Sequence, residues 1–149
     1  MRARGYGFGY QKLKFTIADF RFYLDVECIM GANKIGRYGV DFRCNANDSY
    51  YCFSISPSGY YSLEIYTNKT WRSIISYRFS DLIRRGNSPN SLMVEMVGQK
   101  ITLGVNGQIL ATAIDSTLKS GYFGLYVVTS KDDSVKEIRF RNFRLYSLE

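Results

Sequence analysis

Aromatic and charged side chains in the first half of the chain have the chemistry of a sugar-binding surface. The candidate residues are Asp41, Arg43, Tyr60, Glu64 and Tyr66. Sugars present apolar C–H faces and hydroxyl edges, so flat aromatic rings beside planar hydrogen-bonding groups suit them. A solvated sheet face with ordinary cross-strand pairs has the same composition. The residues therefore support two interpretations, a ligand-binding face and a plain surface.

Asp25 and Glu27 form a second candidate site, because they lie two residues apart in an alternating stretch. Successive side chains leave a strand on opposite sides, so both carboxylates point to one face. Such a pair can meet Arg43 or another cation across a sheet. Glycoside hydrolysis needs two carboxyl groups facing each other across a groove, roughly 5–9 Å apart. We predict that this pair is ion-paired on the surface and retain both residues as candidate ligand contacts.

Several kinds of catalytic and metal site are excluded by composition. The chain has no histidine, which rules out histidine-based triads and zinc sites that need imidazole. Cys28, Cys44 and Cys52 do not have metal-ligand spacing. Cys44 and Cys52 flank one turn and could pair in an oxidising compartment, but an odd number of cysteines fits reduced, half-buried thiols at least as well.

Two polar clusters resemble calcium ligands in composition, one at Asn45, Asn47 and Asp48 and one at Asp132 and Asp133. Calcium needs several converging oxygen atoms. Short polar turns explain both clusters without a metal, because Asn and Asp stabilise tight turns. The sequence therefore predicts no metal site and no cofactor.

The stretch 37–66 must position the first candidate site. It contains three runs that alternate between apolar and polar residues, and turn residues at 45–49 and 57–59 separate them. Strict alternation is typical of a strand with one buried face. We predict an antiparallel meander whose inward side chains include Val40, Phe53 and Leu63 and whose outward face carries the candidate residues.

Further strands are predicted along the rest of the chain. Alternation indicates strands at 12–17, 22–30, 71–75, 92–96, 101–105, 109–114, 120–128 and 135–148. Asn106 and Gly107 predict a tight hairpin, and the inward pattern of the last strand slips at Asn142, which predicts a β-bulge. About ten regularly spaced strands indicate an all-β fold, an antiparallel two-sheet β-sandwich. We expect an extension or linker at 1–11 and one domain at 12–149.

The net charge of +7 over 149 residues is compatible with an anionic partner. The 20 Lys and Arg residues are scattered, and the longest runs are pairs such as Arg84 and Arg85. There is no basic tract, no nucleic-acid-binding signature and no apolar run long enough to span a membrane. We attribute the charge to solubility and expect no specific nucleic-acid partner. The only Trp, Trp71, is expected in the core or at the rim of the sandwich.

Three segments of the meander, 38–43 (YGVDFR), 50–56 (YYCFSIS) and 59–63 (GYYSL), resemble concanavalin A-like lectin/glucanase domains. The most similar types are the laminin-G-like and 3-keto-disaccharide-hydrolase-like modules of bacterial multidomain proteins. The resemblance extends over about residues 20–146, and the segments 90–94, 101–107, 120–125 and 140–143 follow in the same order. It implies a jelly-roll sandwich with one concave sheet, whose groove often holds a glycan.

The same resemblance bears on catalysis. Retaining glucanases of this superfamily carry a Glu-x-Asp-x-Glu run in which two carboxylates act as nucleophile and acid/base. Here Tyr23 occupies the first of these positions, before Asp25 and Glu27. Because a required carboxylate is missing, we predict no catalytic residues and no enzymatic activity.

We therefore predict a non-catalytic recognition module that binds glycan through the outward face of 37–66. The alternative is a protein–protein interaction or assembly module within a larger protein, and a degenerate glycoside hydrolase-like domain is the third hypothesis. Exposed Tyr60 and Tyr66 on an open face would favour glycan binding, whereas a covered face would favour assembly. A location outside the cytoplasm or at the cell surface is expected if the chain belongs to a larger secreted or membrane-anchored protein. The oligomeric state is left open.

Overall fold

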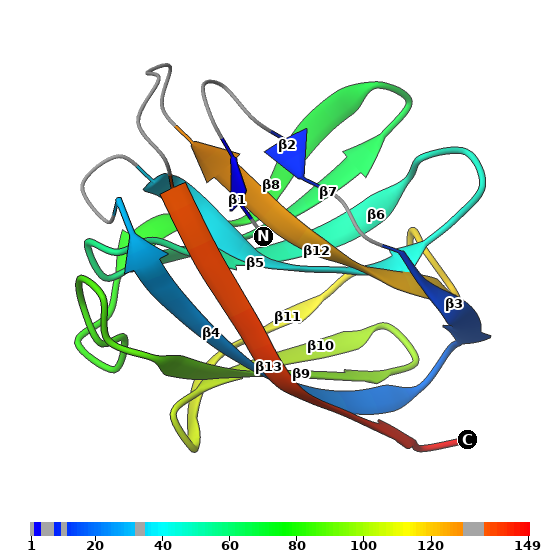
Figure 1. Cartoon of the computed structure of the whole chain (residues 1–149). Helices are drawn as coiled ribbons and strands as arrows, with labels where there is room; N and C mark the ends of the chain where they lie inside the picture. Colours follow the sequence, from blue (N-terminus) through cyan, green and yellow to red (C-terminus); the bar gives the residue numbers. More distant parts are fainter. Residues whose placement is uncertain (1, 4–7, 10–11, 32–34, 130–135) are drawn as a thin grey trace.

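The chain folds into two antiparallel sheets packed face to face (Figure 1). The computed structural model describes residues 2–3, 8–9, 12–31, 35–129 and 136–149, and the described residues form strands and turns without a helix. Accordingly, no helix in them is long and apolar enough to cross a membrane. The predicted all-β, two-sheet sandwich is confirmed.

Sheet A has the strand order β1-β13-β4-β9-β10-β11. Its strands are β1 (Arg2–Ala3), β4 (Phe20–Met30), β9 (Asn90–Val97), β10 (Lys100–Val105), β11 (Gln108–Ile114) and β13 (Lys136–Ser147). Sheet B has the order β2-β12-β5-β6-β7-β8, and β3 also pairs with β12. Its strands are β2 (Phe8–Gly9), β3 (Lys12–Ile17), β5 (Ile35–Cys44), β6 (Tyr50–Ile55), β7 (Tyr60–Thr67), β8 (Thr70–Phe79) and β12 (Gly121–Thr129). The predicted meander is β5–β7, and β8 extends it.

Two parts of the stretch predicted as an extension add strands to the sandwich. β1 pairs with β13, and β2 pairs with β12. The other residues of 1–11 lie outside the described part of the chain. The described parts of the stretch therefore belong to the sheets. Exposed edge strands have unpaired backbone N–H and C=O groups, and a neighbouring segment can pair with them.

The core lies between the sheets and follows the predicted alternation. Phe22, Leu24 and Val26 of β4 meet Val40 and Phe53 of sheet B in one apolar cluster. Along β4 the residues between them are only partly buried, so this strand has one inward and one outward face. Alternation thus places one side of each strand in the core.

The predicted turn and bulge are both confirmed. Asn106 and Gly107 have φ angles of 53° and 80°, which suits the tight turn between β10 and β11. The pairing of β13 with β4 shifts between Arg141 and Arg144, and Asn142 has φ 54°. The shift lets β13 keep apolar side chains inward on both sides of the bulge.

Candidate functional site

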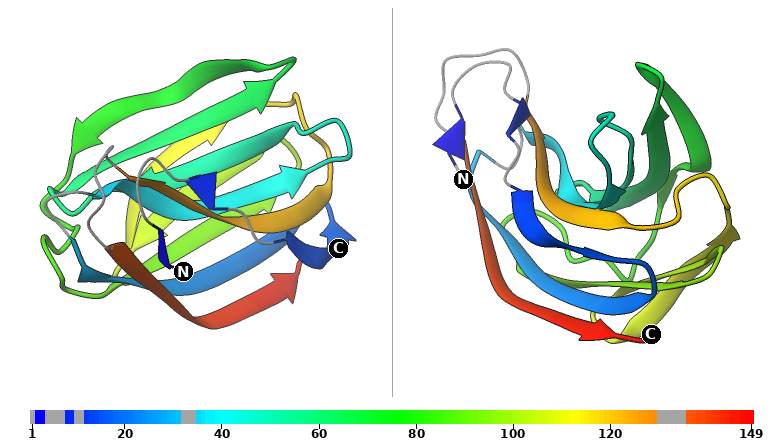
Figure 2. Two further views of the ribbon diagram at one scale, coloured as in Figure 1. Left: turned by 45° about the horizontal axis from the view of Figure 1, so that its top comes forward. Right: turned by 90° about the vertical axis from the view of Figure 1, so that its right-hand side faces the viewer.

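The candidate site is the outer face of sheet B, which points away from the core. Sheet B curls so that this face is concave, with β7 and β8 along one side (Figure 2). Tyr61, Leu63 and Ile65 of β7 point into the core, so Tyr60, Glu64 and Tyr66 occupy the outer face. Tyr60 is exposed, and Glu64 and Tyr66 are half-buried. The structure therefore brings these three predicted residues onto one face.

The centre of this face is polar. Arg37 Nη1 on β5 donates to Glu64 Oε2 on β7 at 2.9 Å and lies 3.3 Å from the Ser62 hydroxyl. Ser62 in turn contacts Ser54 of β6, with 3.2 Å between the hydroxyl oxygens. An Arg–carboxylate pair beside hydroxyl groups offers both donors and acceptors to a polyhydroxylated ligand.

An aromatic cluster lies at one end of the face. Tyr66 and Trp71 face each other across the β7–β8 hairpin, with ring centroids 5.1 Å apart. Tyr50 contacts both rings, at 5.4 and 5.7 Å, and Tyr126 lies 6.4 Å from Trp71. Trp71 remains 41% exposed, so its ring is partly accessible from solvent. Exposed rings of this kind serve as stacking surfaces.

A second aromatic group lies toward the other end of β7. Tyr60 stacks on Tyr77, with centroids 4.9 Å apart and an interplanar angle of 15°. Phe79 packs against Tyr60 edge-on, and Arg37 lies 5.9 Å over the Tyr77 ring. Tyr60, Tyr77 and Phe79 are all exposed. Tyr60 and Tyr66 are six residue steps apart along β7, which corresponds to about 20 Å.

Asp41 lies beneath this face and is sealed from solvent. Its side chain has no exposed surface, and neither carboxyl oxygen has a hydrogen-bond partner among the described residues. Cys52, its cross-strand neighbour on β6, and then Glu64 on β7 continue the same row. Burial raises the pKa of Asp41 to about 8, although the adjacent Cys52 thiol partly opposes the shift. This shift favours the protonated, neutral form of Asp41 at pH 7.

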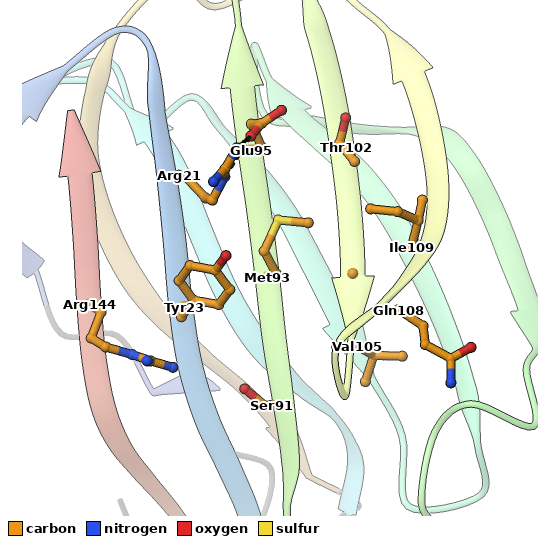
Figure 3. Close-up of a pocket in the computed structure, with 12 residues that line it drawn as sticks. Arg21, Tyr23, Ser91, Met93, Glu95, Thr102, Val105, Gln108, Ile109 and Arg144 are labelled. Atoms are coloured by element: carbon orange, nitrogen blue, oxygen red, sulfur yellow. Dashed lines mark hydrogen bonds and ion pairs between the residues drawn. The ribbon is translucent and has the colours of Figure 1, made fainter. Parts of the chain in front are cut away.

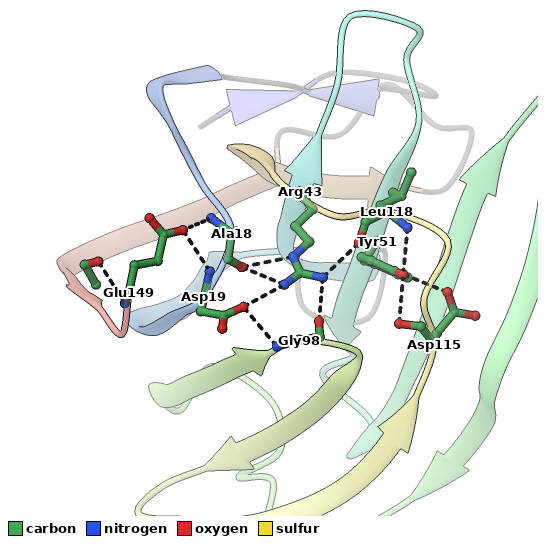
Figure 4. Close-up of polar contacts among 9 residues, drawn as sticks. Ala18, Asp19, Arg43, Tyr51, Gly98, Asp115, Leu118 and Glu149 are labelled. Atoms are coloured by element: carbon green, nitrogen blue, oxygen red, sulfur yellow. Dashed lines mark hydrogen bonds and ion pairs between the residues drawn. The ribbon is translucent and has the colours of Figure 1, made fainter.

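The predicted outward orientation of Arg43 is wrong. Arg43 has φ 48°, which breaks the alternation of β5, and its side chain is 1% exposed. Its guanidinium donates to the carbonyl oxygens of Ala18, Gly98 and Leu118 and lies 3.3 Å from Asp19 Oδ1 (Figure 4). Every donor group is thus directed at the connections that follow β3, β9 and β11. Arg43 has a structural role and does not contribute to the concave face.

A second polar link lies beside Arg43. The Leu118 N–H donates to the hydroxyl of Tyr51 at 3.1 Å, and that hydroxyl donates to Asp115 Oδ1 at 2.7 Å (Figure 4). Asp115 also accepts a hydrogen bond from Arg72 at 2.8 Å. Burial alone would raise the pKa of Asp115, but the hydrogen bonds from Arg72, Tyr51 and Thr117 hold it below its ordinary value.

Asp25 and Glu27 lie on the other sheet and are separate from the meander. Asp25 Oδ2 accepts a hydrogen bond from Asn142 Nδ2 at 2.7 Å. Glu27 Oε2 lies 3.1 Å from Arg141 Nη2 and 3.8 Å from Arg139 Nη1. The predicted ion-paired surface is confirmed for Glu27, but its cations come from β13 and not from Arg43. Sequence alternation assigns faces within a strand and cannot say which sheet a strand joins.

The structure gives no support for a metal site in the described residues. They contain no group of three or more His, Cys, Asp or Glu side chains that could hold a metal ion. The Asn45 side chain accepts the N–H groups of Asn47 and Ser49 at 2.9 and 3.2 Å and so closes its own turn. Asp132 and Asp133 lie outside the described residues. Cys28, Cys44 and Cys52 are buried thiols.

Sequence reasoning missed several residues of the concave face, among them Arg37, Trp71 and Tyr77. Arg37 lies at an even spacing from Asp41, so alternation already placed it on this face. Trp71 was expected in the core or at the rim, and the turn at Asn68 and Lys69 would have shown that it faces Tyr66. Tyr77 lies beyond the predicted strand 71–75, and only the longer observed β8 brings it to Tyr60.

Comparisons with known proteins give structural matches only. No family model matches the sequence, and no curated protein matches it. The carbohydrate-binding module CBM66 from Bacillus subtilis superposes with a TM-score of 0.79 at 19% identity, over 98% of this chain and 86% of that chain. Sheep galectin-11, in a complex with glycerol, superposes with a TM-score of 0.67 at 14% identity, over 93% of this chain and 96% of that chain. A Bacillus licheniformis β-glucanase superposes with a TM-score of 0.68 at 13% identity, over 95% of this chain and 72% of that chain.

These matches agree with one another on architecture. All three similar structures are β-sandwiches of the jelly-roll type, and the superpositions extend over nearly all of this chain. The chain therefore has the concanavalin A-like lectin/glucanase fold, as the sequence resemblance implied. Sequence identities below 20% show a shared fold only. The activity has to be argued from the residues of the site.

Proposed function

We propose that the chain is a non-catalytic, lectin-like module that binds carbohydrate through the concave face of sheet B. The observation that carries the proposal is the arrangement of the Arg37–Glu64 pair between two exposed aromatic groups, one containing Trp71 and the other Tyr60 and Tyr77. Aromatic rings supply stacking surface for the C–H faces of sugars, and the charged pair supplies directional hydrogen bonds. One similar structure is named a carbohydrate-binding module.

The carboxyl groups of this face support a binding role over a hydrolytic one. Asp41 and Glu64 lie on strands separated by β6, with Cys52 between them. Asp41 has no exposed surface, and Glu64 is held by Arg37. A general acid must reach the glycosidic oxygen, and a nucleophile must reach the anomeric carbon. A sealed acid and an ion-paired partner two strands away do not meet this requirement.

A glycan-array screen of the purified chain, followed by calorimetric titration of the best ligand, tests the proposal. We expect Trp71→Ala, Tyr60→Ala and Glu64→Gln each to weaken binding at least about tenfold, because each removes a stacking surface or a charged hydrogen bond. The matched control is Ile114→Ala, which truncates an exposed apolar side chain of β11 on sheet A.

Unchanged binding in all three sheet B variants would overturn the proposed site. If the folded chain binds no glycan at all, the interaction-module alternative replaces the proposal, and the exposed aromatic side chains of sheet B become the surface to map against a protein partner.

A further inference from the structure

A depression of about 500 Å³ lies on the outer face of sheet A, on the opposite side of the sandwich from the concave face (Figure 3). Strands β4, β9, β10 and β11 form it, and Arg144 of β13 closes one side. Pockets of a few hundred Å³ accommodate small organic ligands. Position 104 in the floor is a glycine, and a Cβ there would come within 3.0 Å of Met93 Cε. The missing side chain keeps the depression open.

The charge of the depression is positive once its ion pair is counted. Arg21 and Arg144 both line it, and Glu95 is the only acidic side chain among the lining residues. Arg21 is already neutralised, since its Nη2 lies 2.6 Å from Glu95 Oε2 and its Nε donates to the same carboxylate at 2.7 Å. Arg144 makes no hydrogen bond or ion pair with any described residue. Among the described residues, Arg144 therefore has no counter-ion.

Arg144 is nevertheless held in place. Its guanidinium carbon lies 5.0 Å over the ring of Tyr23, in a cation–π contact, and Tyr146 packs edge-on against the same ring. Figure 3 shows the Arg144 side chain extending from β13 toward β4, with its guanidinium beside Tyr23 at the edge of the depression. Stacking fixes the plane of the guanidinium while its N–H groups stay available. A planar fork of donors fits a carboxylate, sulfate or phosphate group.

The remaining lining combines apolar surface with neutral hydrogen-bonding groups. Met93, Ile109 and the Tyr23 ring supply apolar surface, and Ile109 is 60% exposed. Thr102 and Gln108 supply hydroxyl and amide groups on the opposite side from Arg144 (Figure 3). This composition suits a ring with C–H faces and hydroxyl groups that also carries one negative charge.

We propose that this depression is a second binding site, specific for a saccharide unit that carries an anionic group, with Arg144 as the anion contact and Tyr23, Met93 and Gln108 around the ring. The anion is a carboxylate or a sulfate ester, because the guanidinium fork recognises both. The site does not depend on the concave face, since the two surfaces lie on different sheets.

A smaller depression of about 300 Å³ adjoins the first and shares Ser91 with it. Asp25 and Arg84 line its sides. Arg84 donates to the Pro89 carbonyl at 3.2 Å and forms no ion pair with a described residue. A chain of sugar units can therefore continue from the Arg144 depression along β4 and β9, and the candidate residue Asp25 belongs to this second surface.

Titration followed by amide chemical shifts in two-dimensional NMR tests the proposal. The probes are galacturonic acid, galactose 6-sulfate and neutral galactose, at low and high salt. We expect saturable shifts at Tyr23, Met93, Thr102 and Gln108 with one or both acidic sugars and none with galactose. High salt weakens the binding, because a partly exposed cation is screened. Comparison of the two acidic sugars distinguishes a carboxylate from a sulfate ligand.

Three variants sharpen the test. Arg144→Gln removes the charge, and Gln108→Glu adds a negative charge with almost no change in shape. We expect each to weaken acidic-sugar binding at least about tenfold. Arg139→Gln is the matched control, an arginine of the same strand that lies near Glu27 and outside the depression.

Equal shifts with galactose, no shifts at tens of millimolar ligand, or full binding by Arg144→Gln would each overturn the proposal. The sheet B variants Trp71→Ala and Glu64→Gln leave these shifts unchanged, so failure of this site and failure of the concave face are separately visible.

Discussion

Arg37 on β5 reaches across β6 to Glu64 on β7, with 2.9 Å between Nη1 and Oε2. The two residues are 27 positions apart in sequence and meet because β5, β6 and β7 form a meander in register. Their side chains are 28% and 21% exposed, so the pair is accessible from the concave face without being fully solvated. It is the polar centre between the two aromatic groups.

Loss of the Arg37–Glu64 pair is expected to weaken glycan binding much more than it destabilises the fold. Glu64→Gln is expected to lower the free energy of unfolding by no more than about 1 kcal/mol, because partly exposed ion pairs contribute little. Glycan affinity is expected to fall about tenfold, since a charged acceptor is lost. Urea denaturation and calorimetric titration measure the two effects. Glu27→Gln on sheet A removes a comparable ion pair and should leave glycan affinity unchanged; a similar loss in both variants would contradict the role of the pair.

Asp41 predicts an unusual dependence of stability on pH. Its folded-state pKa of about 8 lies above the ordinary value of 3.8, so the folded chain binds a proton that the unfolded chain releases between these values. The contribution of Asp41 is therefore fully present below about pH 4 and is lost as pH rises through about 8.

Asp41→Asn removes this titration while keeping the shape of the side chain. We compare the free energy of unfolding of the variant with that of the wild type. From pH 5 to pH 9 this difference is expected to shift in favour of the variant by a few kcal/mol, at up to about 1.4 kcal/mol per pH unit. Urea denaturation at pH 5, 7 and 9 measures the difference. The ionisable side chains coupled to Asp41 are Cys52, Tyr50 and Tyr126, so Cys52→Ser serves as a control that keeps the carboxyl group. A pH-independent difference between Asp41→Asn and the wild type would show that the carboxyl is not buried in its neutral form.

Arg43 is predicted to be among the most sensitive positions in the chain. Arg43→Met keeps much of the volume but leaves the carbonyl oxygens of Ala18, Gly98 and Leu118 without their donor. Removing a buried, fully bonded charge typically costs about 3–5 kcal/mol. Arg78→Met, at an exposed position of β8, should change stability by no more than about 0.5 kcal/mol. If chemical denaturation shows equally small losses in the free energy of unfolding for Arg43→Met and Arg78→Met, the loops are not held by Arg43.

Gly39 is predicted to be required for the pairing of β5 with β6. A Cβ at this position would overlap the backbone carbonyl of Phe53, and a backbone atom in a central strand cannot move aside. Gly39→Ala is therefore expected to cost at least about 3 kcal/mol or to prevent folding. At Gly36 the nearest atom to an added Cβ is 3.4 Å away, so Gly36→Ala should be tolerated within about 1 kcal/mol. Thermal unfolding of the two variants distinguishes these cases.

The sequence by itself determined the strands, the turns and the inward face of each strand. Period-two alternation identified Val40, Phe53 and Leu63 as core residues, because a strand with one buried face must alternate. The turn at Asn106-Gly107 was predictable because Asn and Gly favour positive φ angles. The bulge at Asn142 was predictable because an extra residue shifts the alternation of the strand by one. The outward positions of Tyr60, Glu64 and Tyr66 followed from the same rule.

Only the tertiary structure decided what those faces meet. The assignment of strands to sheets separated Asp25 and Glu27 from the meander, because pairing between distant strands leaves no local signal. Asp41 is fully buried in the folded chain, although alternation placed it on the outer face of the meander. A positive φ turned Arg43 toward carbonyl groups that come from three other segments. Burial and polar partnership depend on segments far away in the chain, and one strand's own residues do not encode them.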